Sequence, residues 1–165
     1  MTRKLLELSG IGADRLHLAW VSSAEAQRFA SLASEVVDSV TRQGPLQRDR
    51  LQLQLEAARR TLDSEPVRWT VGKEKHLLES GDVYARQWTR EAYETALDTI
   101  LEQEYQQQLV YAALRHGCES VYDIRDRIGL EPPTISFLLA QMEKEGLVEL
   151  RSLEDRQPKF CAVAP

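Results

Sequence analysis

The chain has 165 residues, the length of one ordinary domain or of two small ones. Apolar residues make up 42% of it and charged residues 28%, a composition typical of globular proteins and not of disordered ones. The longest unbroken apolar run, residues 109–114, is far shorter than the roughly 20 residues that a membrane-spanning helix needs. The N-terminus also lacks the apolar stretch of a signal peptide, because Glu7 interrupts it at once. We therefore expect no membrane insertion and a cytoplasmic location.

The charge balance and the cysteine count exclude further classes. Lys and Arg number 21 against 26 Asp and Glu, a net charge of −5, which argues against a strong sequence-independent grip on nucleic acid. Cys118 and Cys161 are too few for a disulfide framework or a four-thiolate metal site. The three histidines show no ligand spacing, and no serine or cysteine stands in a recognisable catalytic motif. We expect no metal, cofactor or catalytic residue on this chain, and two reduced thiols.

Residues 1–45 predict a helix, a strand and a second helix. Residues 3–8 read as a short helix that ends at Gly10, and residues 15–21 alternate apolar and polar side chains with the period of a strand. Ser22 and Glu25 have the spacing of a capping box in front of the next helix. That helix carries apolar residues at helical spacing, and a Gly44-Pro45 pair ends it.

A single strand cannot satisfy its own backbone groups, so this segment predicts a fragment of an α/β fold of the parallel-sheet type. The only local candidate for a neighbouring strand is the weak one at residues 67–71. Either that stretch or another polypeptide must supply the sheet. We expect the apolar side chains of the strand and helix to pack into this shared sheet, namely Leu16, Leu18, Trp20, Phe29, Leu32, Val36 and Val40.

Residues 46–104 predict a charged helical connector. Its first apolar stripe comprises Leu51, Leu55, Ala58 and Leu62, and its second Ala92, Tyr93, Ala96, Leu97, Ile100 and Leu101. Between the stripes, Arg68, Lys73 and Lys75 lie near Trp69, a combination suited to contact with an acidic partner. The alternative is a solvated face on which the cations serve only solubility.

Residues 105–165 predict three helices and a two-stranded ribbon, the element order of a winged helix-turn-helix. The helices end at Gly117, Gly129 and Gly146, and the third begins at Pro132-Pro133. Strands are expected at 147–151 and 159–163, joined by a turn at 154–158. The fold class of the whole chain is therefore α+β, mostly helical.

The third of these helices is a poor candidate for reading DNA. Lys144 is its only cation, and from Tyr105 onward the chain carries seven cations and nine anions, a net charge of −2. Winged helices also dock proteins, and Phe137 is the apolar anchor that this surface offers. Docking is favoured over DNA binding, and a DNA-binding transcriptional regulator remains the alternative.

Residues 5–45 resemble the C-terminal half of the delta subunit of methyl-viologen-reducing hydrogenase. The shared features are an arginine–leucine pair at Arg15-Leu16, a tryptophan at Trp20, the phrase Ser22-Ser23-Ala24-Glu25, then Phe29-Ala30 and the Gly44-Pro45 ending. The stretch from Trp69 through residues 81–84 into the winged helix resembles an extension that some longer members carry.

The resemblance implies an accessory, electron-transfer subunit of a redox complex, docked on heterodisulfide-reductase-like flavoproteins. The 2Fe-2S centre of the family is held by cysteines in the N-terminal half, which has no counterpart in this sequence, so the cluster and the flavin are expected on partner chains. The missing half-domain is expected either on one such partner or upstream of a shortened gene model. The residues that we expect to dock partners are Trp20, Arg68, Trp69, Lys73, Lys75 and Phe137.

Overall fold

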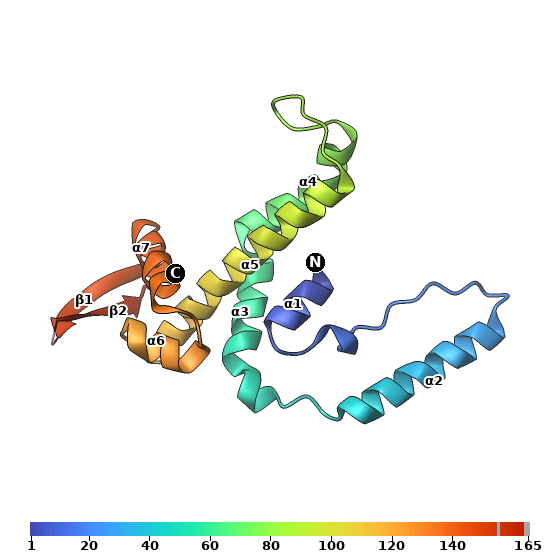
Figure 1. Ribbon diagram of the computed structural model, residues 1–165, viewed down its shortest axis with the longest axis horizontal. Helices are drawn as coiled ribbons and strands as arrows, with labels where there is room; N and C mark the ends of the chain where they lie inside the picture. Colours follow the sequence, from blue (N-terminus) through green and yellow to red (C-terminus); the bar gives the residue numbers. More distant parts are fainter. Residues whose placement is uncertain (155, 164–165) are drawn as a thin grey trace. The chain divides into compact units, whose positions relative to one another are not determined.

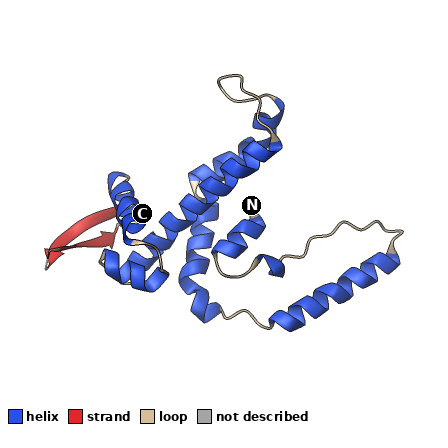
Figure 2. Ribbon diagram, viewed as in Figure 1, coloured by secondary structure: helices blue, strands red, loops and turns tan. Residues whose placement is uncertain are grey.

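The computed structural model describes residues 1–154 and 156–163 of the chain. It is mostly helical, with one small two-stranded antiparallel sheet near the C-terminus, which confirms the α+β class (Figures 1 and 2). The chain divides into two compact units, residues 1–52 and 53–165. None of the helices in the described part of the chain has the length and apolarity that a membrane crossing requires.

Unit 1 contains α1 (Thr2–Leu8), the 3-10 helix η1 (Ala13–Arg15), α2 (Ala26–Gln43) and a second 3-10 helix, η2 (Arg48–Leu51). The expectation of a strand at residues 15–21 is wrong for the chain by itself, since the segment after η1 runs as an extended loop to α2 (Figure 2). The reason is the absence of a neighbour. The strands among the described residues, β1 and β2, pair with each other, so this segment has no ladder to join.

The expected capping box in front of α2 is only half formed. The Ser22 amide donates to a Glu25 carboxylate oxygen at 2.8 Å, as expected. The Ser22 hydroxyl, however, accepts a long hydrogen bond from the Ala24 amide at 3.4 Å, and Glu25 at the N-cap makes no side-chain cap. The helix therefore begins at Ala26.

Unit 2 begins with α3 (Gln52–Asp63) and α4 (Glu65–Glu79), which are followed by the 26-residue helix α5 (Arg90–Arg115). Helices α4 and α5 run side by side and antiparallel (Figure 1). The Tyr93 hydroxyl donates to the Thr70 carbonyl at 3.2 Å, and Arg90 pairs with Glu74 at 3.2 Å. Leu77, Tyr93 and Leu97 form the core between them.

Two expectations for this region need correction. Residues 67–71 are not a strand but part of α4, because a proline in the first turn favours the start of a helix. The residues that α4 buries, Val67, Thr70 and Leu77, have helical spacing. The buried stripe of α3 is also displaced from the expected one. It comprises Leu53, Ala57, Ala58 and Thr61, whereas Leu62 is 44% exposed.

The C-terminal module, residues 105–163, contains the second half of α5 together with α6 (Val121–Ile128), α7 (Pro132–Lys144), β1 (Val148–Glu154) and β2 (Gln157–Ala162). This order of elements confirms the expected one, although α5 crosses the proposed boundary at residue 105 without a break. The strands are longer than expected and pair with Leu150 opposite Phe160. The turn expected at 154–158 contains Asp155, which lies outside the described residues, as do residues 164–165.

Local signals explain where the helices of the C-terminal module begin and end. A full capping box links Ser120 and Asp123 at the start of α6, and Gly129 ends it in the left-handed conformation at φ 75°. The helices and strands then share one buried core, which comprises Val110, Tyr111, Ala113, Leu114, Ile124, Ile135, Leu138, Leu139, Met142 and Val148.

We expect Ile135→Ala to lower the free energy of unfolding by about 2–5 kcal/mol, because Ile135 is fully buried in this core. The control is Phe137→Ala on the same helix, whose side chain is 68% exposed and whose change should stay within about 0.5 kcal/mol. Urea denaturation followed by circular dichroism measures both. Equal losses for the two variants would contradict this assignment of the core.

Candidate functional site

The six residues expected to dock partners all lie at the surface. Trp20 is 85% exposed, Phe137 68% and Trp69 57%, and the three cations Arg68, Lys73 and Lys75 are exposed as well. The structure does not gather them into one site. Trp20 belongs to unit 1, the residues from 68 to 75 belong to α4, and Phe137 lies on α7.

The α4 surface, defined as Arg68, Trp69, Lys73 and Lys75, is the one place where several of these residues come together. They occupy the part of α4 that does not face α5, since α4 buries other positions against its neighbour. None of the three cations forms an ion pair within the described residues. A cationic surface with an exposed indole is therefore available to a partner.

Unit 1 exposes a second, apolar surface. Helix α2 buries none of its 18 residues, although its apolar side chains follow one face. Among them, Phe29 is 64% exposed, Val37 62% and Val40 54%. In the preceding loop Leu18 is 73% exposed, next to the even more exposed Trp20. Of the side chains expected to pack into a sheet, Leu18, Trp20, Phe29 and Val40 are thus exposed in the isolated chain, whereas Leu16, Leu32 and Val36 are half-buried.

Hydrogen bonds join the residues before the extended loop to the residues at the end of α2. The Arg15 guanidinium donates to the carbonyls of Gln43 at 3.3 Å and Gly44 at 3.0 Å. The Gln43 side chain returns a hydrogen bond to the Asp14 carbonyl at 3.1 Å. These hydrogen bonds hold the start of the extended loop next to the C-terminal end of α2.

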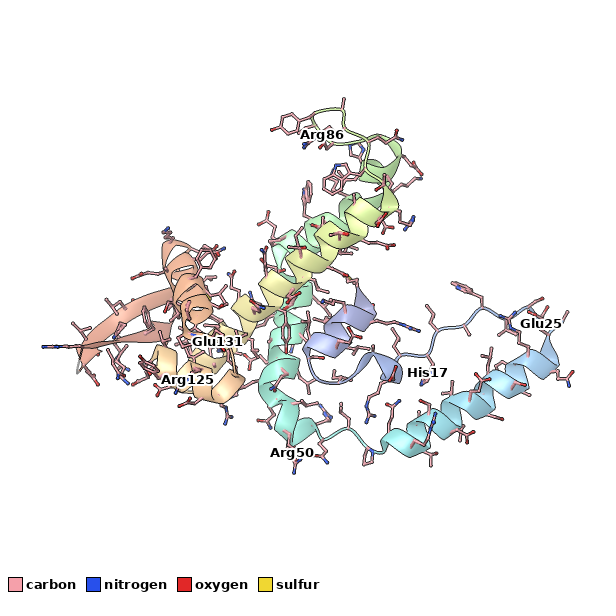
Figure 3. All side chains as sticks on the ribbon, viewed as in Figure 1. His17, Glu25, Arg50, Arg86, Arg125 and Glu131 are labelled. Carbon is pink, nitrogen blue, oxygen red and sulfur yellow. The ribbon has the colours of Figure 1, made fainter. Side chains whose placement is uncertain are left out.

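A third surface, the loop between α4 and α5, was not found from the sequence. Val83 is 93% exposed and Tyr84 77% exposed in this loop, in which Figure 3 labels Arg86. The Asp82 carboxylate accepts hydrogen bonds from the amides of Tyr84 at 2.9 Å and Arg86 at 3.0 Å, and from the Arg86 side chain at 2.8 Å. The Trp88 indole adds a longer one at 3.4 Å.

The loop between α4 and α5 also requires a glycine at position 81. Gly81 has φ 85°, and a Cβ at this position would lie 2.8 Å from the Arg86 carbonyl oxygen, so only glycine fits. Partial desolvation alone would raise the pKa of Asp82, but the hydrogen bonds from Arg86, Tyr84 and Trp88 outweigh it and lower the pKa to about 2. The signal in the sequence was the Gly-Asp pair, which predicts a turn but not this network.

Several cations of the C-terminal module have carboxylate partners. Arg151 lies 3.5 Å from Glu119, Lys159 lies 3.9 Å from Asp123, and Arg125 pairs with Asp126 at 2.7 Å, whereas Arg127 and Lys144 are exposed and form no ion pair with a described residue. On α7 the Gln141 amide donates to Glu145 at 3.2 Å. These partners compete with phosphate and base contacts, which leaves Phe137 as the prominent exposed group of α7.

No group of three or more His, Cys, Asp and Glu side chains in the described ranges is placed to hold a metal ion. Burial, helped by Asp123, raises the pKa of the Cys118 thiol. Desolvation and Glu149, which accepts a hydrogen bond from the Cys161 thiol, raise the pKa of Cys161. Both thiols thus resist ionisation to the thiolate that a metal or cluster needs.

Comparison with known proteins adds no relative. No family model matches this chain, and no curated protein or solved structure matches it either.

We expect Asp82→Asn to loosen the loop between α4 and α5, because the amide lacks the charge that holds the Arg86 guanidinium. Hydrogen exchange should become faster at the amides of Tyr84 and Arg86. Because the folded pKa of Asp82 is lowered to about 2, the wild-type loop should keep its stabilisation above the ordinary aspartate range and lose it as the pH falls towards 2. Asp63→Asn, at the exposed end of α3, is the control. Unchanged exchange in Asp82→Asn would contradict the role of the carboxylate.

Proposed function

We propose that this chain is an accessory subunit of a cytoplasmic redox complex, which acts by docking to iron–sulfur and flavin-containing subunits. The observation that carries the proposal is the uncovered apolar surface of unit 1, formed by α2 and the extended loop before it. The same residues carry the resemblance to the delta subunit of methyl-viologen-reducing hydrogenase.

The energetics of unit 1 favour a partner. Apolar surface costs about 25 cal/mol for each Å² left in water, and α2 leaves Phe29, Val37 and Val40 exposed and buries none of its residues fully. Contiguous patches of this kind mark protein interfaces. Residues 16–22 add a backbone segment that no strand among the described residues pairs with, and such a segment can join the sheet of another chain.

The proposed occupant is therefore a partner chain that brings the rest of an α/β half-domain. Its sheet would pair with the extended loop, in which Leu18 and Trp20 point to the same face and would be buried together, while α2 covers one face of the sheet. In this proposal the 2Fe-2S cluster and the flavin belong to partner chains, and this chain contributes structure to the docked assembly.

The C-terminal module, which we propose to be a winged helix-turn-helix, has a docking role in the same proposal. The order of three helices and a hairpin around one core supports this subfold. Carboxylates next to its cations and the exposed Phe137 favour protein contact over DNA contact. In the alternative, a DNA-binding regulator, those cations would have to leave their carboxylate partners and contact the phosphates of DNA.

We expect Val36→Glu to abolish co-purification with the iron–sulfur and flavin subunits, because a carboxylate on the apolar face of α2 cannot be buried against a sheet without a partner. The control is Ser34→Glu, at an exposed polar position of the same helix. Tagged chains co-expressed with those subunits provide the measurement, together with flavin and iron content of the purified material.

Equal recovery of the complex with both variants would contradict docking through α2. A second assay distinguishes the alternative function. Submicromolar, sequence-selective binding of duplex DNA by the full chain at physiological salt, lost in Lys144→Glu, would replace the docking proposal for the C-terminal module with a regulator.

We also expect the isolated chain to remain without an iron–sulfur cluster after anaerobic reconstitution. Such clusters need four ligands, and burial disfavours the thiolate forms of Cys118 and Cys161. Iron analysis and a visible spectrum provide the measurement. A stoichiometric chromophore that disappears in Cys118→Ser would contradict this expectation.

A further inference from the structure

The arm, defined as α4 and residues 90–104 of α5, exposes opposite charges on its two helices. The α4 surface is cationic through Arg68, Lys73 and Lys75. The exposed side of α5 carries three acids instead, Glu91, Glu94 and Asp98. Of these, Glu94 has only a distant contact with Arg90 at 3.9 Å, and Arg90 lies closer to Glu74 at 3.2 Å.

The two sets of charges lie at similar heights along the arm. Thr70 is level with Tyr93, and Glu74 is level with Arg90, as their contacts show. Counting from these pairs at about 1.5 Å per residue puts Arg68 within about one helical turn of the level of Asp98. Lys75 lies on the same face of α4 as Arg68, seven residues later, and the same count puts it within about one helical turn of the level of Glu91.

We propose that the arm binds a second copy of this chain, with α4 of each copy lying against α5 of the other. A two-fold axis parallel to the arm keeps every residue at its own height and exchanges α4 with α5. Arg68 of one copy then meets Asp98 of the second copy, and Lys75 meets Glu91, because each pair of residues on one helix is seven positions apart and shares a face. Val71, three residues after Arg68 and four before Lys75, lies on the same face and is 39% exposed, so an apolar side chain is buried together with these charges.

The arm points to a second copy because one and the same surface carries both halves of the complementary pattern. Helix α2 does not have this property. Antiparallel pairing of α2 with itself about its middle would place Arg28 opposite Arg42 and Glu35 opposite its own copy, which is repulsive. The dimer proposed for the arm is independent of the proposed redox role of unit 1.

The experiment is sedimentation equilibrium of the full chain over a wide concentration range, with the single variants Arg68→Glu and Asp98→Arg. The wild type should form a dimer that dissociates on dilution and weakens with added salt. Each single variant brings like charges together twice in the dimer, so its dissociation constant should rise by about tenfold or more. Arg127→Glu on α6, outside the arm, is the control and should leave dimerisation unchanged.

Charge exchange tests the specific contact. The double variant Arg68→Glu with Asp98→Arg should return to within about threefold of the wild-type dissociation constant, because both pairs become attractive again. An equimolar mixture of the two single variants should form the mixed dimer in preference to either parent, for the same reason. Circular dichroism confirms that each variant is folded.

A monomer at all concentrations would overturn the proposal. So would a dimer that neither single variant weakens, or one that weakens in both without recovery in the double variant or the mixture. Because none of these outcomes depends on a redox partner, failure here leaves the proposed function untouched.

Discussion

The packing of α5 is the constraint on which unit 2 depends. This one helix of 26 residues is buried on its inner side along its whole length, by Tyr93, Leu97 and Leu101 in the arm and by Val110 and Leu114 in the C-terminal module. Helix α3 secures its second half, where Arg60 donates to Gln108 at 2.8 Å and stacks over Tyr111 at 4.3 Å. A rigid helix that belongs to two cores transmits the position of one to the other, so the arm and the module form one unit.

Unit 1 follows the opposite design. Its secondary structure forms, and Arg15 closes its extended loop onto the end of α2, yet the apolar residues of α2 stay uncovered. A folded but unburied amphipathic helix gains little from its own chain, since most helical stability in proteins comes from tertiary packing. The exposed apolar residues of unit 1 are therefore the observation on which the proposed docking to a partner depends.

Sequence patterns predicted the C-terminal module well because its signals are local. Ser120, Gly129 and Pro132 set helix ends through caps and dihedral preferences that involve only a few neighbouring residues. The strand at residues 15–21 could not be decided in this way, because pairing depends on a distant or separate chain. The α3 stripe was displaced for a related reason: which face is buried depends on how α3 meets α5. Among the candidate docking residues, Trp20, Trp69 and Phe137 are exposed, and their docking role stays a prediction, whereas the network around Asp82 needed coordinates.

Hydrogen–deuterium exchange over residues 16–43, in the isolated chain and in the presence of the proposed iron–sulfur and flavin subunits, tests the central claim most directly. The account predicts rapid exchange in the extended loop and weak protection in α2 for the isolated chain, since neither is covered. In the complex, both segments should become protected, with the buried part of α5 unchanged as an internal reference. Protection of α2 equal to that of α5 in the isolated chain, or no change on assembly, would contradict the account.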